Sequence, residues 1–322
     1  MQVTHNVVII GAGFGGLGMA IRLKAQGEEN ILMIEKGHDV GGCWRDNTSP
    51  GAACDVPSHL YSFSFERHYP WSRRFAPQQE IFAYQQYCAR KYDLYRHIRF
   101  HTEVAEAHYR DEDGIWELTL TNGDTLTTRV LITATGQLNR PLMPNIEGLG
   151  SFAGPAFHSA EWQHDVDLKG KRVAVIGTGA SAIQFVPQIV PEVAKLDLYQ
   201  RNAAWVLPKD DAEYSDNRRR WLSRLPLLHT LDRAWQYLSH EVRALGFVHF
   251  TSLVKSSEKT ALRHLQRNIS DPAKRAALTP DYPLGCKRIL ISNNYYPALN
   301  QPHVNVVTDG IEKVVPEGVI TQ

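Results

Sequence analysis

The sequence contains few cysteines, and none of them falls in a motif that would define a redox or metal site. The chain has 322 residues, and its four cysteines are Cys43, Cys54, Cys88 and Cys286. No two form the C-x-x-C pair that zinc ribbons and thioredoxin-like redox sites use. The pattern therefore argues against dithiol–disulphide chemistry, and we expect no metal site. A chain of this length does not need disulfides, so we expect it in the reducing cytoplasm.

Long apolar segments and an excess of charge of one sign are missing as well. No apolar run approaches the roughly 18 residues of a transmembrane helix, and the N-terminus lacks the basic segment of a signal peptide. The 35 Lys and Arg residues balance the 34 Asp and Glu residues. This balance gives no reason to expect nucleic acid or a membrane surface as partner. Composition leaves the oligomeric state open.

The N-terminal segment carries the pattern of a strand, a glycine-rich turn, a helix and a second strand. The apolar, β-branched run at residues 7–10 predicts a buried strand, and residues 31–34 predict a second one. Residues 17–26 predict a helix that ends at Gly27. The turn between them, residues 11–16, reads G-A-G-F-G-G. The whole segment therefore predicts a nucleotide-binding unit.

The glycines of this turn match the G-x-G-x-x-G fingerprint. Gly11 permits the tight turn, Gly13 lets the backbone approach a pyrophosphate, and Gly16 allows close packing of helix and strand. We include Gly15 among the cofactor-binding residues. The phosphate would meet free N–H groups at the start of the helix. Glu35, at the end of the second strand, would accept hydrogen bonds from ribose hydroxyls, which favours a ribose without a 2′-phosphate.

The same order of elements returns in the second half of the chain. Residues 173–176 and 196–200 predict two strands, and the turn from Gly177 to Ala182 reads G-T-G-A-S-A before a helix that starts at Ile183. Gly177 lies 166 residues after Gly11, and Arg201 lies 166 residues after Glu35. The sequence therefore predicts a duplicated dinucleotide-binding architecture.

The second unit carries Arg201 where the spacing places Glu35 in the first unit. A guanidinium binds a 2′-phosphate through charge-assisted hydrogen bonds, whereas a carboxylate repels it. We expect the second site, with Gly177, Gly179 and Ser181, to bind NADPH in preference to NADH. Two dinucleotide sites of opposite ribose preference imply electron transfer between cofactors, with FAD in the first site and NADPH in the second.

The remaining sequence suggests how these units are arranged. An alternating run, an Asn122-Gly123 turn and a second run predict a hairpin at residues 116–128. The predicted fold class is α/β, with two Rossmann-like dinucleotide-binding domains and a helical insertion in the second. The proline-rich stretch around residues 140–144 suggests a boundary, so we assign the FAD domain to residues 1–145. The NADP domain then covers residues 146–322, with the insertion at about 212–280.

One helix of the insertion carries an apolar stripe. Its residues are spaced three or four apart, which places them on one helix face. We expect this face to pack in a helix–helix seam, although a binding groove is also possible. The stripe consists of Leu228, Leu231, Trp235, Leu238, Val242 and Leu245.

A longer motif precedes the second glycine-rich turn. Phe152, Gly154, His158 and Trp162 match the pattern F-x-G-x-x-x-H-x-x-x-W. In this motif the chain resembles the class B flavoprotein monooxygenases, and most closely the N-terminal two thirds of type I Baeyer–Villiger monooxygenases. The resemblance implies that His158 positions the linker between the cofactor domains. Taken without it, a lone histidine is more often structural.

Further segments support the same resemblance. Residues 41–44 resemble a G-G-T-W segment beside the flavin, with Cys43 in place of Thr, and residues 50–55 resemble a P-G-x-x-x-D loop. Residues 287–288 match a K-R pair. The resemblance implies that Asp55 and Arg288 lie in the active site and that Lys287 assists Arg201. The implied flavin-binding residues outside the first turn are Gly42, Trp44, Asp55 and Gly136.

The resemblance also implies a reaction. In the family, NADPH reduces FAD, the reduced flavin forms a C4a-peroxyflavin with O₂, and a ketone becomes an ester or lactone. A permanently charged Arg288 would stabilise the negative charge that develops. Two alternatives stay open: an oxygenase that acts on nitrogen or sulfur, and a truncated nucleotide-binding fragment without catalysis. The second alternative arises because family members are longer, which implies an incomplete FAD domain here.

Overall fold

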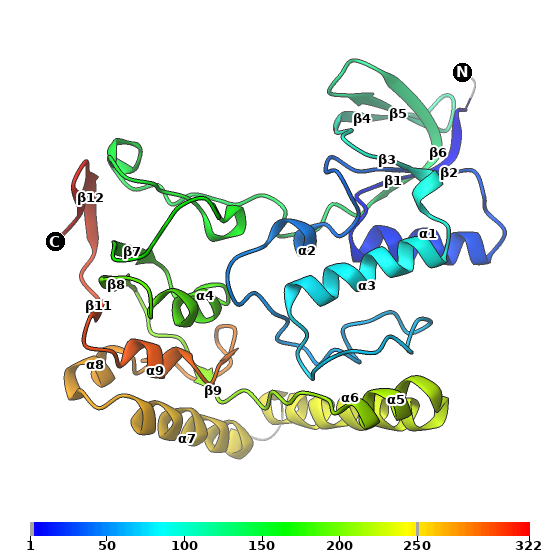
Figure 1. Cartoon of the computed structure of the whole chain (residues 1–322). Helices are drawn as coiled ribbons and strands as arrows, with labels where there is room; N and C mark the ends of the chain where they lie inside the picture. Colours follow the sequence, from blue (N-terminus) through cyan, green and yellow to red (C-terminus); the bar gives the residue numbers. More distant parts are fainter. Residues whose placement is uncertain (1–2, 249–250) are drawn as a thin grey trace. The chain divides into compact units, whose positions relative to one another are not determined.

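The computed structural model describes residues 3–248 and 251–322, and the chain divides into two compact units (Figure 1). Each unit combines segments that are distant in the sequence. The first consists of Met1–Thr48, Phe63–Glu66 and Gln78–Pro141, and the second of Ser49–Ser62, Arg67–Pro77 and Leu142–Gln322. Both combine helices with sheets, so the chain has an α/β fold.

The first unit contains a six-stranded sheet in the order β3-β2-β1-β6-β5-β4. Strands β1, β2, β3 and β6 run parallel, whereas β4 and β5 are antiparallel to their neighbours. The predicted hairpin is confirmed, and Gly123 in its turn has φ +90°. The bounds are β1 His5–Ile10, β2 Ile31–Ile34, β3 Ile98–Arg99, β4 Val104–Arg110, β5 Ile115–Leu120 and β6 Thr125–Thr133.

Helices α1 (Phe14–Ala25) and α3 (Gln78–Lys91) lie side by side in this unit (Figure 1). The predicted first helix is confirmed, and Gly27 beyond its end has the left-handed φ of +90° that glycine tolerates best. Helix α2 (Cys43–Asp46) and the 3₁₀ turn η1 (Tyr95–His97) complete the unit. Buried side chains on the sheet form a core of Val8, Leu32, Ile34, Leu118, Leu120 and Leu126.

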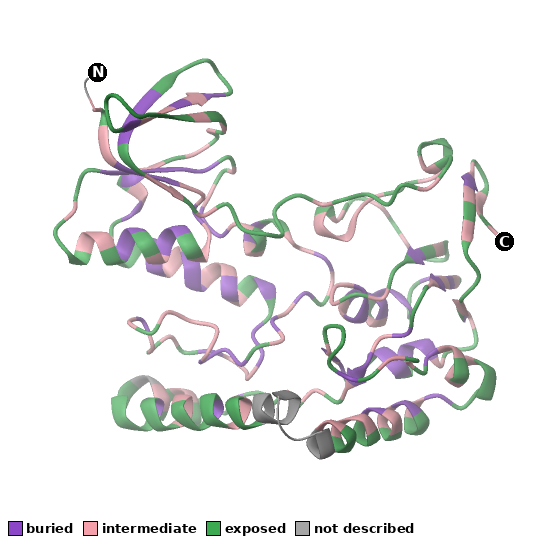
Figure 2. Ribbon diagram, turned by 180° about the vertical axis from the view of Figure 1, so that it is seen from behind, coloured by how far each residue is buried: buried purple, intermediate pink, exposed green. Residues whose placement is uncertain are grey.

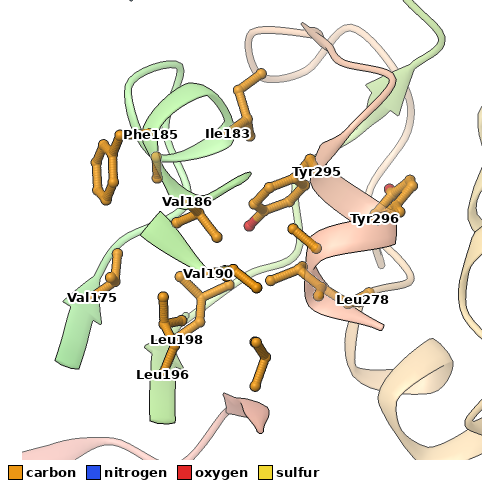
Figure 3. Close-up of a cluster of buried hydrophobic side chains, with 14 of the residues drawn as sticks. Val175, Ile183, Phe185, Val186, Val190, Leu196, Leu198, Leu278, Tyr295 and Tyr296 are labelled. Atoms are coloured by element: carbon orange, nitrogen blue, oxygen red, sulfur yellow. The ribbon is translucent and has the colours of Figure 1, made fainter. Parts of the chain in front are cut away.

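The second unit contains a three-stranded parallel sheet in the order β11-β8-β7. The strands are β7 (Arg172–Ile176), β8 (Lys195–Tyr199) and β11 (Val304–Val307). Helices α4 (Ala182–Ile189) and α9 (Tyr295–Leu299) pack together in its core. Figure 3 shows this core, where side chains of α4 meet those of β8 and the ring of Tyr295.

Smaller elements flank this sheet. The two-stranded parallel pair β9 (Val206–Leu207) and β10 (Leu290–Ile291) joins segments on either side of the helical region. Strands β12 (Ile311–Val315) and β13 (Gly318–Thr321) form an antiparallel hairpin. The 3₁₀ turns are η2 (Leu149–Ser151) and η3 (Ser159–Glu161).

Helices follow β9 on both sides of the undescribed residues 249–250, as the sequence predicts. They are α5 (Asp216–Arg224), α6 (Pro226–Val248), α7 (Thr251–Asn268) and α8 (Pro272–Ala277). The hydroxyl of Ser215 caps α5 and the carboxylate of Asp271 caps α8, which satisfies N–H groups at both starts. Within the described ranges no helix combines the length and apolar character needed to cross a membrane.

The apolar stripe on α6 is exposed, so the predicted helix–helix seam is wrong for this structure. Trp235 is 73 % exposed and Val242 58 %, and Leu228, Leu231 and Leu238 are exposed as well. The reason is that α6 packs through its opposite, polar face, where His229 and Gln236 are buried. In Figure 2 the outer face of α6 carries the colour of exposed residues. The side chain of Leu245 lies outside the described part of the structure.

The buried polar face of α6 contacts the segment that follows Asp55. His59 Nδ1 lies 2.7 Å from Asp232 Oδ2, and Arg218 Nη2 donates to Asp232 Oδ1 at 3.0 Å. His229 is only 1 % exposed, and its ring lies 4.9 Å from that of His59. Neither ring nitrogen of His229 has a hydrogen-bond partner among the described residues. Burial, together with the nearby His59 and His68, lowers the pKa of His229 to about 4.

We predict that the second unit loses stability in mild acid because His229 resists protonation when folded. Above pH 6.5 both states hold a neutral imidazole. Between pH 6.5 and 4 only the unfolded chain takes up the proton. By linkage, this lowers the free energy of unfolding by about 3 kcal/mol. Chemical denaturation between pH 4 and 7 measures this loss. His229→Gln should make the unfolding free energy depend less on pH. The control His108→Gln, at an exposed site, should keep the pH dependence of the wild type. An unchanged pH dependence in His229→Gln would contradict the role given to His229.

Candidate functional site

The first glycine-rich turn connects β1 to α1 in a geometry that only glycine satisfies at two positions. Gly11 has φ +103°, and its N–H donates to the carbonyl of Ile34 at 2.8 Å. A Cβ on Gly11 would lie 2.5 Å from the carbonyl oxygen of Ala134. A Cβ on Gly16 would lie 1.9 Å from the carbonyl oxygen of Gly11. These glycines therefore serve the close packing of strand, turn and helix.

The start of α1 is open to a ligand in this turn. Gly13 occupies the N-cap position, and no side chain caps the helix there. A Cβ on Gly13 would meet only the Gly42 backbone, at 3.7 Å, so the turn keeps its backbone accessible. The first N–H groups of a helix lack intrahelical acceptors and favour an anion. This cradle suits a pyrophosphate group.

Three further residues predicted to bind the flavin, Gly42, Trp44 and Gly136, belong to the first unit. The Gly41 N–H donates to the carbonyl of Ala12 at 2.9 Å, which holds the Gly41–Gly42 loop beside the turn. Gly42, with φ +53°, is the N-cap of the short helix α2 that carries the half-buried Trp44. Gly136, with φ +73°, is exposed after the end of β6.

The Glu35 carboxylate follows β2 and is buried, with 5 % of the residue exposed. Its Oε2 accepts the Ala12 N–H at 2.9 Å, so the carboxylate is hydrogen-bonded directly to the glycine-rich turn. Its Oε1 accepts the Gly37 N–H at 2.7 Å and Nη1 of Arg45 at 3.0 Å. The structure therefore places Glu35 beside the turn, as the fingerprint predicts, in a fixed orientation.

The second glycine-rich turn repeats this geometry between β7 and α4. Gly177 has φ +103°, the same value as Gly11, and its N–H donates to the carbonyl of Tyr199 at 2.9 Å. Ser181 precedes α4, and no side chain caps this helix. A Cβ on Gly177 or Gly179 would meet no atom within 4 Å, so space is open in front of this turn. The residues present fit a second phosphate-bearing ligand.

The strand registers correct one inference from the sequence spacing. Ile10 of β1 pairs with Ile34 and Ile176 of β7 pairs with Tyr199, so Gln200 rather than Arg201 is the counterpart of Glu35. The backbone agrees, because the N–H groups of Glu35 and Gln200 each donate to the next parallel strand at 3.0 Å. The second unit is one residue shorter between its first glycine and the end of its second strand, so Arg201 lies two positions after that strand, whereas Glu35 directly follows β2.

Arg201 and Lys287 occur close to one another in the second unit. Both side chains are exposed. Lys287 Nζ donates to Asn202 Oδ1 at 3.1 Å, and Asn202 is the residue directly after Arg201. The structure thus brings the predicted lysine to the segment that holds the predicted arginine. Two cations in the unit that also contains an uncapped helix start suit a ligand with more than one phosphate group.

The signature motif forms a local structure against the core of the second unit. His158 Nδ1 accepts the Ala160 N–H at 3.1 Å and so caps η3. The Trp162 ring lies 5.3 Å from that of Phe157 and 5.2 Å from that of Phe185 on α4. Phe152 and Gly154 are in contact, since a Cβ on Gly154 would lie 2.8 Å from the Phe152 ring. The motif therefore anchors the chain that leads into β7.

Asp55 and Arg288 form an ion pair although they are distant in the sequence. Arg288 Nη2 donates to Asp55 Oδ2 in the second unit. Arg288 is exposed and Asp55 is partly buried. The structure brings together the two residues that the family resemblance implies for the active site. A guanidinium held by one carboxylate retains further N–H donors for another anion.

Two of the four cysteines, Cys54 and Cys88, are buried. All four lie in the described part of the chain, and none is paired with another. Burial raises the pKa of the Cys54 thiol and of the Cys88 thiol to about 12 in each case. Both thiols are therefore protonated and unreactive at neutral pH.

Two residues at these sites escaped the sequence analysis. Arg45 is 7 % exposed and contacts Glu35, but no motif marks a charged residue of a short helix as buried. Gln200 is also buried, and its Nε2 donates to the Ala277 carbonyl at 2.7 Å. Only the register of β8 identifies Gln200 as the counterpart of Glu35.

Comparison with known proteins places this arrangement among flavin-dependent enzymes. A family model described as pyridine nucleotide-disulphide oxidoreductase matches residues 8–223. A Baeyer–Villiger monooxygenase of Pseudomonas aeruginosa is 49 % identical over 98 % of the chain and 60 % of its own length. A Baeyer–Villiger monooxygenase of Streptomyces coelicolor is 47 % identical over 96 % of the chain and 59 % of its own length. The chain thus spans about 60 % of the length of these curated relatives.

A solved structure shows the same fold. The crystal structure of OTEMO in complex with FAD and NADP is 29 % identical to the chain, with a TM-score of 0.86. The match covers 100 % of this chain and 69 % of that protein.

Proposed function

Because the chain belongs to the pyridine nucleotide-disulphide oxidoreductase family, and within it to the Baeyer–Villiger flavoprotein monooxygenases, we propose that it uses NADPH, FAD and O₂ to insert one oxygen atom beside a ketone carbonyl. The product is an ester or lactone. The observation that carries the proposal is a pair of glycine-rich turns of the same geometry. The second strand of the first unit is followed directly by the acidic Glu35, and that of the second unit, two positions on, by the basic Arg201. That pattern suits two dinucleotides that exchange electrons.

The domain assignment forms part of the proposal. Two Rossmann-like domains hold the cofactors, the FAD domain at residues 1–145 and the NADP domain at residues 146–322. The helices at about 212–280 form an insertion in the NADP domain. The balanced charge of 35 basic and 34 acidic residues supports a small molecule as the partner. The reducing cytoplasm is the proposed compartment.

The first unit supplies the proposed flavin site. The uncapped start of α1, with Gly13 and Gly15, holds the pyrophosphate, while Gly11 and Gly16 maintain the turn. Glu35 accepts a hydrogen bond from the adenosine ribose. Gly42, Trp44 and Gly136 complete the proposed flavin contacts of this unit. FAD, when bound, supplies hydride acceptance and the activation of O₂.

The second unit supplies the proposed NADPH site. Gly177, Gly179 and Ser181 bring the start of α4 to the pyrophosphate, because no side chain occupies that space. Arg201 binds the 2′-phosphate, and Lys287 assists it from the neighbouring segment. Gln200 at the position of Glu35 is uncharged, so no carboxylate at that strand end repels the phosphate.

The Asp55–Arg288 pair has the proposed catalytic role. The positively charged guanidinium of Arg288 donates hydrogen bonds to the oxygen on which negative charge develops as the ketone is attacked. Asp55 holds one Nη of Arg288 and leaves its other N–H groups to the reacting atoms. His158 and Trp162 act indirectly, because they fix the chain before β7 rather than touch the substrate.

Removal of the Arg201 guanidinium tests the assignment of the second site. Arg201→Ala should weaken NADP⁺ binding by about 10- to 100-fold, because charge-assisted hydrogen bonds to phosphate contribute ~1.5–3 kcal/mol. NAD⁺ binding should change little. Calorimetric titration of both nucleotides measures the difference, with Arg267→Ala as an exposed-arginine control. Equal weakening of NADP⁺ and NAD⁺ binding would contradict the assignment of Arg201 to the 2′-phosphate.

Removal of the Arg288 guanidinium tests the proposed reaction. Arg288→Ala should reduce ester formation from a ketone by at least ~100-fold, the order expected for one donor to a developing oxyanion. FAD content should remain at the wild-type level, and Arg288→Lys should retain part of the activity. Product analysis by gas chromatography measures the ester, and a parallel assay with a sulfide tests heteroatom oxygenation. Unchanged ester formation in Arg288→Ala removes this residue from the mechanism.

A further inference from the structure

Arg45 is a buried cation at the first dinucleotide site, and every contact of its guanidinium is within the first unit. Nη1 donates to Glu35 Oε1 at 3.0 Å and to the carbonyl of Asp39 at 2.5 Å. Nε and Nη2 donate to the two carboxylate oxygens of Asp46 at 2.6 and 2.7 Å. The planar fork therefore connects Glu35 to the helix that follows the Gly41–Gly42 loop. Lysine, with a single ammonium group, lacks a fork of this shape.

The chain makes room for this guanidinium at Gly37. A Cβ on Gly37 would lie 2.1 Å from Arg45 Nη1 and 2.2 Å from Cζ. The φ of Gly37 lies outside the left-handed range, so its backbone does not itself require glycine. The absence of a side chain at position 37 therefore serves the placement of Arg45. The Gly37 N–H adds its own hydrogen bond to Glu35 Oε1, at 2.7 Å.

These contacts leave one oxygen of Glu35 with spare capacity. A carboxylate has about four acceptor positions, two on each oxygen. Oε1 receives two hydrogen bonds, from Gly37 and Arg45, whereas Oε2 receives one, from the Ala12 N–H of the turn. Oε2 can therefore accept one more donor beside the turn. The orientation of the carboxylate decides whether that position is available to a ribose hydroxyl.

We propose that Arg45, seated against Gly37, is a positioning residue for the ribose-binding carboxylate of the first site. It holds Oε1 of Glu35 and so directs Oε2 to the adenosine ribose of FAD. This inference rests on the proposed flavin function of the first unit. It assigns part of the affinity for FAD to a residue that itself touches no cofactor atom.

The charges around Arg45 sum to a negative value. Two carboxylates, Glu35 and Asp46, face the single guanidinium of Arg45. Arg45 therefore aligns Glu35 without cancelling the charge that repels a 2′-phosphate. Burial by itself lowers the pKa of Arg45. Hydrogen bonds and charges from Asp46 and Glu35 outweigh that effect, so the pKa is raised above its usual value.

A double-mutant cycle tests the proposal on the intact chain. The variants are Arg45→Ala, Gly37→Ala and the two combined, with Gly150→Ala as control because a Cβ there meets nothing. Each protein is titrated with FAD and with FMN, which lacks the adenosine ribose. A general loss of fold would weaken both ligands, whereas a misplaced Glu35 affects FAD alone. Arg45→Lys serves where the alanine variant does not fold, and should retain part of the FAD affinity.

We expect Arg45→Ala and Gly37→Ala each to weaken FAD binding by about 10- to 100-fold, the range of charge-assisted hydrogen bonds. FMN affinity should be unchanged. The combined variant should bind FAD no worse than Arg45→Ala, because the new methyl group then meets no guanidinium. Equal losses for FAD and FMN, or additive losses in the combined variant, would overturn the positioning role while the flavin function stands. A wild-type chain that binds neither ligand would contradict the proposed function and, with it, this inference.

Discussion

The structure depends on two helix starts that no side chain caps, each placed by a glycine-rich turn directly after a strand. In both units a glycine with φ +103° turns the chain from the first strand into a helix that no side chain caps. The first N–H groups of a helix lack intrahelical acceptors, so such a start favours an anion. The sheets, the close packing at Gly16 and the second strands all serve to hold these donors in place. The two proposed dinucleotide sites rest on that constraint.

Charge beyond the second strand then separates the two otherwise similar turns. The first unit places Glu35 there, fixed by the turn and by Arg45. The second places the uncharged Gln200 at the same register and Arg201 one position further on. Because the second unit has one residue fewer between turn and strand end, a different side chain occupies the position that we propose for ribose binding. The proposed flow of electrons, from a phosphorylated nicotinamide nucleotide to a flavin, rests on this difference.

Sequence patterns predicted the local elements well, because their signals lie within a few residues. The turns, the hairpin at Gly123 and the helices from Asp216 onward follow from periodicity and glycine spacing. The Asp55–Arg288 pair could be expected only through the family resemblance, since no periodicity connects residues so distant. Burial across elements was not predictable. The polar face of α6 packs around His229 while its apolar stripe is exposed, and Arg45 is buried through contacts made by its neighbours.

The most direct measurement is the absorbance spectrum of the purified 322-residue protein with FAD, before and after NADPH is added without oxygen. The account predicts a bound flavin whose visible absorbance bleaches with NADPH, and bleaches far less with NADH. That result requires two dinucleotide sites of opposite ribose preference, joined by electron transfer. A chain that stays colourless with added FAD, or a bound flavin that NADPH and NADH reduce equally well, would contradict it.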